Sequence, residues 1–109
     1  MDELKNHPAL NIYVNELLKW NKSVNLIGRN TEKDVWDVHI RDSLQILDYV
    51  KNSRYKSVVD IGTGSGLPGI PLSIFIPEKK FYLTDLNQKR IAFLDFITKK
   101  LKLNAVVID

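Results

Sequence analysis

One short stretch, in which an apolar strand runs into a glycine-rich turn, constrains the fold of this chain more than any other. Residues 57–61 (Ser-Val-Val-Asp-Ile) have the composition of a buried strand, and Gly62, Gly64 and Gly66 follow at alternate positions. The apolar run over residues 70–76 then predicts a helix. A strand, a glycine turn and a helix in this order bring backbone N–H groups to the place where a ligand binds.

The spacing of this turn favours one class of ligand. Dinucleotide sites use G-x-G-x-x-G, whereas this turn reads G-x-G-x-G and has Asp60 two residues before its first glycine. A carboxylate at that position repels a pyrophosphate and attracts an ammonium group. The turn therefore favours a cationic ligand that bears an amino acid, such as S-adenosylmethionine, over an NAD-type dinucleotide or a turn that binds nothing.

Downstream of the turn, strands and helices are predicted to alternate. Strands are expected over residues 57–61, 80–84 and 105–108, and helices over residues 68–76 and 87–102. This alternation predicts βαβ units and a parallel sheet, which is an α/β fold. Half of a doubly wound sheet leaves apolar strands uncovered. We therefore expect the first half of a larger fold, as a fragment, a truncated product or the remnant of a disrupted gene.

The residues before the sheet are predicted to be helical. We expect residues 1–56 to form a helical segment that packs on the sheet, and residues 57–109 to form a truncated Rossmann-like domain, within one structural unit. A first helix is predicted from Pro8, which suits a first helical turn, to about Trp20. Thr31 resembles the N-cap of a second helical stretch that continues to about residue 50, with Arg41 as the candidate position for a bend.

Composition narrows the class of protein. The 109 residues include no cysteine, so disulfides, thiolate metal sites and cysteine nucleophiles are excluded, and we expect no metal site. No apolar run approaches the length of a membrane span, and we expect a cytoplasmic protein. The net charge of +3 is spread along the chain, which permits a nucleic-acid partner without requiring one. The sequence does not specify an oligomeric state.

Two acidic residues accompany the glycine turn. Asp85 ends the second predicted strand, where such folds hydrogen-bond the ribose hydroxyls of a nucleoside. It is also placed to cap the helix that begins near Asn87. Asp60 has a competing role as an acceptor of N–H groups in its own loop. For both residues the two roles stay open.

Other polar residues invite sharper interpretations. His39, Asp42 and Ser43 resemble a catalytic triad, but a triad also needs an oxyanion site, which nothing in the sequence indicates. We favour a hydrogen-bonded cluster that braces the glycine loop, together with Asn25, over direct contact with a substrate. Trp20 is predicted to pack in the core. The pairs and runs of lysine and arginine are predicted to form a solvated surface rather than an RNA contact, at residues 79–80, 89–90 and 99–102.

Several motifs together resemble one bacterial family. They are Trp20-Asn21-Lys22-x-x-Asn25-Leu26, His39-x-x-Asp42-Ser43-Leu44, the run Val59-Asp60-Ile61-Gly62-Thr63-Gly64-Ser65-Gly66-Leu67-Pro68-Gly69-Ile70-Pro71-Leu72, and Asp85 followed by Lys89-Arg90-x-x-Phe93-Leu94. In these motifs the chain resembles the small-subunit ribosomal RNA guanine-N7 methyltransferases, the glucose-inhibited division protein B group. The match covers about residues 16–103 and lacks the C-terminal half of the family.

The resemblance implies a function and a set of site residues. It implies S-adenosylmethionine as methyl donor and N7 of a guanine in small-subunit (16S) ribosomal RNA as acceptor. It implies that Gly62 and Leu67 line the cofactor, with Thr63, Gly64 and Gly66 in the same loop, that Asp60 anchors the amino end, and that Asp85 meets the ribose. Lys89, Arg90 and His39 are candidates for the RNA side.

No catalytic acid or base is named, because N7 of guanine has a free lone pair and the transfer needs no proton abstraction. Alignment of the two reacting groups is then the main source of catalysis. Two alternatives stay open, namely an inactive remnant that binds cofactor or RNA, and an NAD-type dinucleotide-binding domain.

Overall fold

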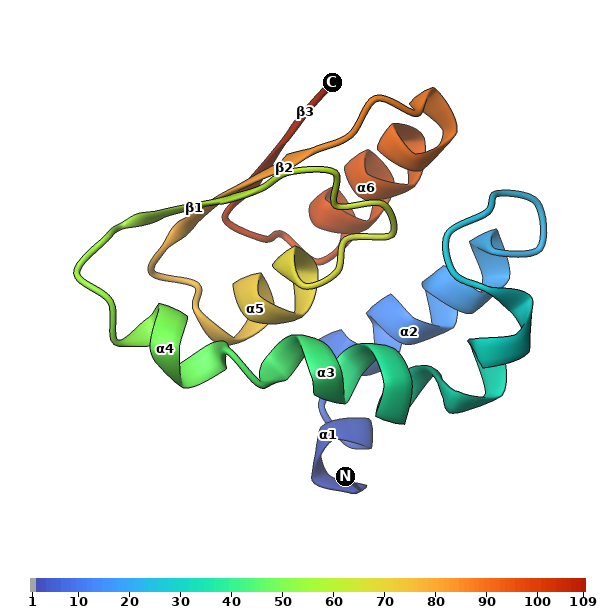
Figure 1. Cartoon of the computed structure of the whole chain (residues 1–109), viewed down its shortest axis with the longest axis horizontal. Helices are drawn as coiled ribbons and strands as arrows, with labels where there is room; N and C mark the ends of the chain where they lie inside the picture. Colours follow the sequence, from blue (N-terminus) through green and yellow to red (C-terminus); the bar gives the residue numbers. More distant parts are fainter. Residues whose placement is uncertain (1) are drawn as a thin grey trace.

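The computed structural model describes residues 2–109 and places a set of short helices before a three-stranded sheet (Figure 1). The N-terminal elements are α1 (Asp2–Lys5), α2 (Pro8–Trp20), the 3-10 helix η1 (Arg29–Asp34), the short π-helix η2 (Val35–Ile40), α3 (Arg41–Leu44) and α4 (Leu47–Lys51). The remaining elements are β1 (Ser57–Asp60), α5 (Gly69–Phe75), β2 (Lys80–Thr84), α6 (Gln88–Lys100) and β3 (Ala105–Ile108).

The sheet is parallel and its order is β1-β2-β3, so each strand lies beside its neighbour in the sequence. Val58 pairs with Phe81, and Phe81 with Ala105, which sets the register across all three strands. The carboxyl ends of β1 and β2 therefore meet at one edge. The predicted α/β alternation with a parallel sheet is confirmed.

One face of the sheet carries the core. Figure 1 shows α5 and α6 on the same side of the strands, with α2 and α3 further out on that side. Buried side chains from the strands meet buried side chains of these helices, among them Leu10, Leu17, Ile70, Phe81, Leu83, Phe93 and Ile97. Trp20 packs edge-on against Phe93, with ring centroids 5.4 Å apart, as predicted for a packing residue.

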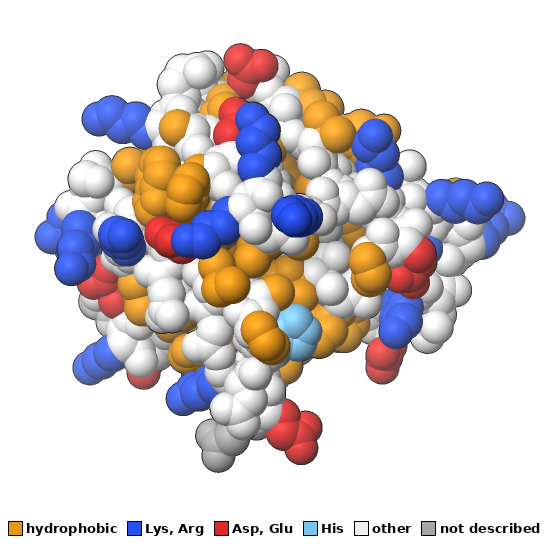
Figure 2. All heavy atoms as spheres, turned by 180° about the vertical axis from the view of Figure 1, so that it is seen from behind, with side chains coloured by type: hydrophobic (Ala, Val, Ile, Leu, Met, Phe, Trp, Pro, Cys, Tyr) orange, Lys and Arg blue, Asp and Glu red, His pale blue; other side chains and the backbone are white. Residues whose placement is uncertain are grey.

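The other face of the sheet is uncovered. Its apolar residues are exposed, with accessible fractions of 58% for Val59, 39% for Val106 and 43% for Ile108. Hydrophobic side chains are visible along the upper right of Figure 2, which after the 180° turn corresponds to the upper left of Figure 1, where β1 lies. The expectation that half of a doubly wound sheet leaves apolar strand surface uncovered is confirmed for this chain.

The region between residues 29 and 51 differs from the prediction. The N-cap predicted at Thr31 is wrong, because η1 already begins at Arg29, and Thr31 lies inside it and donates a hydrogen bond to the Gly28 carbonyl. The bend considered near Arg41 corresponds to the change from η2 to α3 at that residue. The buried residues Val35 and Ile40 are five positions apart, which places them on one face of a π-turn rather than of a regular α-helix. Burial of these two side chains replaces one long helix by several short ones.

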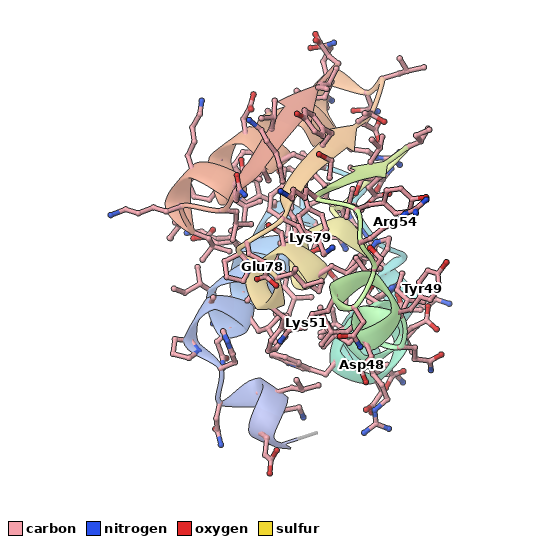
Figure 3. All side chains as sticks on the ribbon, turned by 90° about the vertical axis from the view of Figure 1, so that its left-hand side faces the viewer. Asp48, Tyr49, Lys51, Arg54, Glu78 and Lys79 are labelled. Atoms are coloured by element: carbon pink, nitrogen blue, oxygen red, sulfur yellow. The ribbon has the colours of Figure 1, made fainter. Side chains whose placement is uncertain are left out.

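Lys79 is buried, contrary to its prediction as part of a solvated basic pair. Its ammonium group donates to the carbonyl of Ser53 at 2.9 Å and also bonds the carbonyl of Tyr55. Figure 3 shows Lys79 near the middle of the molecule, whereas Tyr49 and Arg54 lie at its right-hand edge. Lys79 therefore ties the segment before β1 to the start of β2 and is not free to meet RNA. In residues 2–109 no helix is long and apolar enough to cross a membrane.

Candidate cofactor and acceptor site

The loop between β1 and α5 is organised by Asp60, the last residue of β1. Its Oδ2 atom accepts hydrogen bonds from the Thr63 hydroxyl at 2.6 Å and from the Gly69 N–H at 3.0 Å. Burial raises the pKa of the Asp60 carboxyl, and these two bonds offset part of that rise. Asp60 thus joins the start of the loop to the first turn of α5 and orders the loop by accepting its N–H and O–H groups.

The end of β2 holds the middle of the loop. The Thr84 carbonyl accepts the Thr63 N–H at 2.9 Å, and the Thr84 hydroxyl oxygen accepts the Gly62 N–H at 3.2 Å. Asp85 follows, and its Oδ2 accepts the Gly64 N–H at 2.8 Å. The glycine loop is therefore hydrogen-bonded through three successive residues, 62–64, to Thr84 at the end of β2 and to Asp85, which lies at the edge of the loop.

Asp85 does not cap α6. The side chain of Asn87 is the N-cap, accepting the N–H groups of Lys89 and Arg90, while Asp85 Oδ1 accepts the N–H of Asn87 itself. Partial desolvation works to raise the pKa of Asp85. The hydrogen bonds from Asn87 and Gly64 and the charge of Arg90 outweigh that influence and hold the pKa below its usual value. Asp85 is therefore an ionised group at the mouth of the loop.

Helix α2 also holds the loop in place, through one buried side chain. The hydroxyl of Tyr13, on α2, donates to the Ser65 carbonyl at 2.9 Å, and the whole tyrosine is buried. Burial raises the pKa of Tyr13, so that it stays a neutral donor. The two residues are 52 positions apart, and nothing in the local sequence around either one signals the contact.

The glycines of the loop differ in their surroundings, and Gly66 combines a φ of +98° with a Cβ position only 2.4 Å from Ile70. Gly62 and Gly64 have φ values of +67° and +61°, and a Cβ at either position meets no atom within 4 Å, so the space beside their backbone is open. Gly69 faces the opposite situation, because a Cβ there lies 2.4 Å from Leu83 and 2.8 Å from Asp60. The first two glycines expose the loop to a ligand, and Gly69 lets α5 approach the sheet.

A mostly apolar hollow of about 450 Å³ lies at this edge of the sheet. Asp85 and Gly62 line it, flanked by Ile61 and Leu86, whose side chains are 84% and 90% exposed. Two exposed aliphatic side chains beside a carboxylate suit a nucleoside, with its flat base on the apolar surface and its hydroxyls at the acid. Sequence reasoning missed Ile61 and Leu86; the apolar residue directly after each strand was the available signal.

The loop is poorly suited to a pyrophosphate. Its N–H groups already donate to acceptors within the protein at residues 62, 63, 64, 66, 67 and 69. Phosphate cradles rely on free N–H groups that point at the anion. With two carboxylates in the same loop environment, the geometry disfavours an NAD-type ligand and suits a cation.

A second hollow, of about 350 Å³, opens at the far end of the same loop. Leu67 and Pro68 form one wall, and the others come from His39 of η2, Asp42 of α3 and Gln45, the residue after α3. Leu67 is thus placed in this hollow and not beside Asp85. His39 Nε2 lies 2.9 Å from the Thr31 hydroxyl, and burial lowers the pKa of His39, with the nearby Asp42 charge opposing the shift.

The expected brace from His39, Asp42 and Ser43 to the loop is not what these side chains form. Ser43 donates to the His39 carbonyl one helical turn earlier, and His39 pairs with Thr31. Asn25 contributes its backbone carbonyl, which accepts a hydrogen bond from Arg90 Nε at 3.1 Å. The polar cluster therefore holds its own helices together and lines the second hollow.

The segment before η1 is ordered by Asn21, a residue whose role sequence reasoning missed. Asn21 is buried, and its side-chain oxygen accepts the N–H groups of Leu26 and Ile27, while its amide donates to Glu32. Arg90 reaches this segment from α6, so its guanidinium is partly committed to the fold, and Lys89 is exposed. Basic side chains are scattered over the face shown in Figure 2 rather than gathered in one patch.

Comparison with known proteins adds an independent result. The family model described as GidB, rRNA small subunit methyltransferase G, matches residues 6–108. The chain is 44% identical over 95 residues to the ribosomal RNA small subunit methyltransferase G of Magnetococcus marinus, covering 86% of this chain and 42% of that protein. For the proteins of the same name from Desulfitobacterium hafniense and Escherichia fergusonii, identities are 43% and 44%, over 87% and 86% of this chain. The chain spans about two fifths of the length of these relatives.

Proposed function

Because the chain belongs to the rRNA small subunit methyltransferase G (GidB) family, matched over residues 6–108, we propose that it forms the cofactor-binding part of an S-adenosylmethionine-dependent methyltransferase. Its methyl acceptor is N7 of a guanine in small-subunit (16S) ribosomal RNA. Its localisation is the cytoplasm, which contains that RNA. The observation that supports the proposal most is the loop over residues 62–69, in which six N–H groups donate to acceptors within the protein and two carboxylates, Asp60 and Asp85, are among those acceptors.

The residues present fit such a cofactor. Asp85 would accept hydrogen bonds from the ribose hydroxyls, and the exposed side chains of Ile61 and Leu86 would hold the adenine. Gly62 and Gly64 leave open space along which the ligand can lie against the backbone. Asp60 is close enough to the loop to attract the ammonium group. When bound, the cofactor supplies an electrophilic methyl group on a sulfonium.

The chain's own residues then need only to bind and orient. Guanine N7 carries a free lone pair, so no proton has to be removed before it attacks the methyl group. Holding the two reactants in line is worth a large share of the barrier, since it replaces an encounter in solution by a step within the complex. We therefore assign no catalytic acid or base.

A second reading is a chain that binds the cofactor or RNA without transferring a methyl group. The uncovered apolar face of the sheet favours it, since a sheet packed on one face is only part of the layered arrangement of an α/β fold. An NAD-type binder is disfavoured by the occupied loop N–H groups and by the family match.

Methyl transfer separates the two readings. The chain is incubated with labelled S-adenosylmethionine and protein-free small-subunit RNA, and the digested RNA is analysed for 7-methylguanosine. The enzyme reading predicts 7-methylguanosine that disappears in the Gly64→Asp variant. Binding of S-adenosylhomocysteine with no 7-methylguanosine supports the binding-only reading. Labelled methyl groups at another atom contradict the assignment of N7.

A further inference from the structure

The second hollow has the composition of a site for a flat polar ring. Two of its wall residues, Val38 and Ile46, are large apolar side chains that are each 45% exposed, and Leu67 and Pro68 face the same space. Exposed aliphatic side chains that converge on a hollow of about 350 Å³ offer apolar surface for the two faces of a purine. The polar side chains of His39, Asp42 and Gln45 complete the lining.

Asp42 is the charged group of this lining. It lies on α3 and is exposed, and within residues 2–109 no group donates a hydrogen bond to its carboxylate; its backbone carbonyl accepts the Gln45 N–H. An ionised carboxylate has two acceptor oxygens and no donor. It therefore complements a ligand edge that presents two adjacent N–H donors, and it repels an edge that presents lone pairs.

The hydrogen-bond network also fixes the state of His39. Thr31 has one hydroxyl proton, which it donates to the Gly28 carbonyl at 2.8 Å. The 2.9 Å contact between Thr31 Oγ1 and His39 Nε2 must then use a proton on the imidazole. Neutral His39 accordingly carries its proton on Nε2 and leaves Nδ1 as an acceptor. The lining thus offers acceptors from both His39 and Asp42.

We propose that this hollow receives the acceptor guanine base, with the Asp42 carboxylate accepting its N1–H and N2–H₂ groups. The inference rests on the proposed methyltransferase function and assigns its substrate to named residues. Among the four RNA bases, guanine is the one whose Watson–Crick edge presents two adjacent donors, whereas adenine places a ring lone pair there. Asp42 is therefore a specificity-determining residue for guanine.

This orientation suits transfer to N7. The N7 atom lies on the opposite side of the purine from the Watson–Crick edge, so a base held through N1 and N2 keeps its N7 lone pair free. The two hollows share the glycine loop, with Gly62 lining one and Leu67 the other. A cofactor that lies along the loop from Asp85 brings its sulfonium end toward the base.

The charge balance gives Asp42 a second effect. The N7 lone pair forms the new N–C bond, the C–S bond breaks, and its electron pair goes to sulfur. The sulfonium thus becomes a neutral thioether and the guanine becomes cationic. The Asp42 carboxylate, hydrogen-bonded to the guanine, stabilises the positive charge that develops on the guanine. That charge also strengthens the hydrogen bond from N1–H to the carboxylate.

The test maps where a guanine nucleotide binds. Guanosine monophosphate is titrated into the isotope-labelled chain saturated with S-adenosylhomocysteine, and amide shifts are followed by NMR. We expect shifts at Val38, His39 and Leu67, with inosine monophosphate about threefold or more weaker because it lacks the N2 amino group, and adenosine monophosphate weaker still. The Asp42→Asn variant is expected to lose the preference for guanosine. The matched variant Asp48→Asn, one helix further along on α4, keeps it.

Three results overturn the inference: shifts confined to Gly62 and Leu86, equal binding of the guanosine and adenosine nucleotides, or an unchanged preference in Asp42→Asn. Calorimetry with S-adenosylhomocysteine alone reports the cofactor site separately. Intact cofactor binding in Asp42→Asn with a lost guanosine preference supports both proposals. Intact cofactor binding with no guanosine shifts removes only the assignment of the base. Guanosine shifts at Val38 and Leu67 without cofactor binding support the hollow and contradict the cofactor site.

Discussion

Three side chains from three elements hold the glycine loop in place. Asp60 bonds the loop from β1, Asp85 from the end of β2, and Tyr13 from α2. Hydrogen bonds that form within the folded protein order the loop before any ligand arrives, so the ligand does not have to supply that ordering free energy. The site is therefore a preorganised one, and single substitutions around it have separable effects on stability and on affinity.

Tyr13→Phe tests the brace from α2. The change leaves the buried Ser65 carbonyl without its donor, which costs about 1–3 kcal/mol of unfolding free energy. We also expect weaker binding of S-adenosylhomocysteine, because the loop loses a point of attachment. Denaturant unfolding and calorimetry measure the two effects. Tyr49→Phe is the control, since the Tyr49 side chain is 81% exposed, and equal effects of the two changes would sink the assignment.

His39 predicts a pH dependence of stability. Burial lowers its pKa in the folded state, the nearby charge of Asp42 opposing the shift, so the folded protein binds a proton less readily than the unfolded chain. The contribution of His39 is then complete above its unfolded pKa of roughly 6.5 and is lost as the pH falls through the lower folded value. Wild type should lose stability relative to His39→Gln as the pH drops below that point. If the difference in unfolding free energy between wild type and His39→Gln is the same at pH 7.5 and pH 4.5, the lowered pKa of His39 is contradicted.

The acidic residues of the site could be read from the sequence and its other anchors could not. Asp60 lies at the end of the first strand and Asp85 directly after the second, so the parallel sheet brings both to one edge. Thr84 and Tyr13 bond the loop through partners 21 and 52 positions away, and such pairs arise only once the elements pack. Lys79 was predicted to be solvated and is buried, because its ammonium donates to the carbonyls of residues 53 and 55, which are distant in the sequence.

At the level of elements, the docking of α5 on the sheet depends on Gly69. Gly69→Ala places a methyl group 2.4 Å from Leu83, and relieving that overlap moves α5 away from β1 and breaks the Gly69 bond to Asp60. The expected loss is about 1–3 kcal/mol of unfolding free energy, together with weaker cofactor binding. Gly28→Ala serves as the control, because its φ of −63° suits any residue and its near neighbour is the flexible end of Asn30. A stable Gly69→Ala variant with unchanged affinity would rule out this account of α5.

The regular elements follow from local patterns, and the irregular ones do not. The predicted strands over residues 80–84 and 105–108 and the helix over residues 8–20 have the observed bounds, since each has a clear period and a turn residue at its ends. The region over residues 29–51 has apolar residues at mixed spacings of three, four and five. The bounds of its short helices depend on which apolar side chains are buried in the core. Val35 and Ile40 are two that are buried.

At the level of the whole molecule, one side of the sheet is packed and the other is exposed. Val59, Val106 and Ile108 form an apolar strip across two outer strands. We predict that the native chain binds the dye 1-anilinonaphthalene-8-sulfonate at this strip, and that Val59→Thr with Val106→Thr reduces the fluorescence by several fold. Ile12→Thr, on α2, is the control. Equal fluorescence in the doubly substituted and wild-type chains would show that the strip is covered in solution.

The central claim, that the loop over residues 62–69 and Asp85 form a site for S-adenosylmethionine, is tested most directly by calorimetry. S-adenosylhomocysteine is titrated into the wild-type chain and into Gly64→Asp, which places a carboxylate in the open space beside a backbone that aspartate tolerates at positive φ. We predict micromolar binding to the wild type and none to the variant, with equal circular-dichroism spectra. A folded wild-type chain that does not bind, or a variant that binds equally well, would contradict the claim.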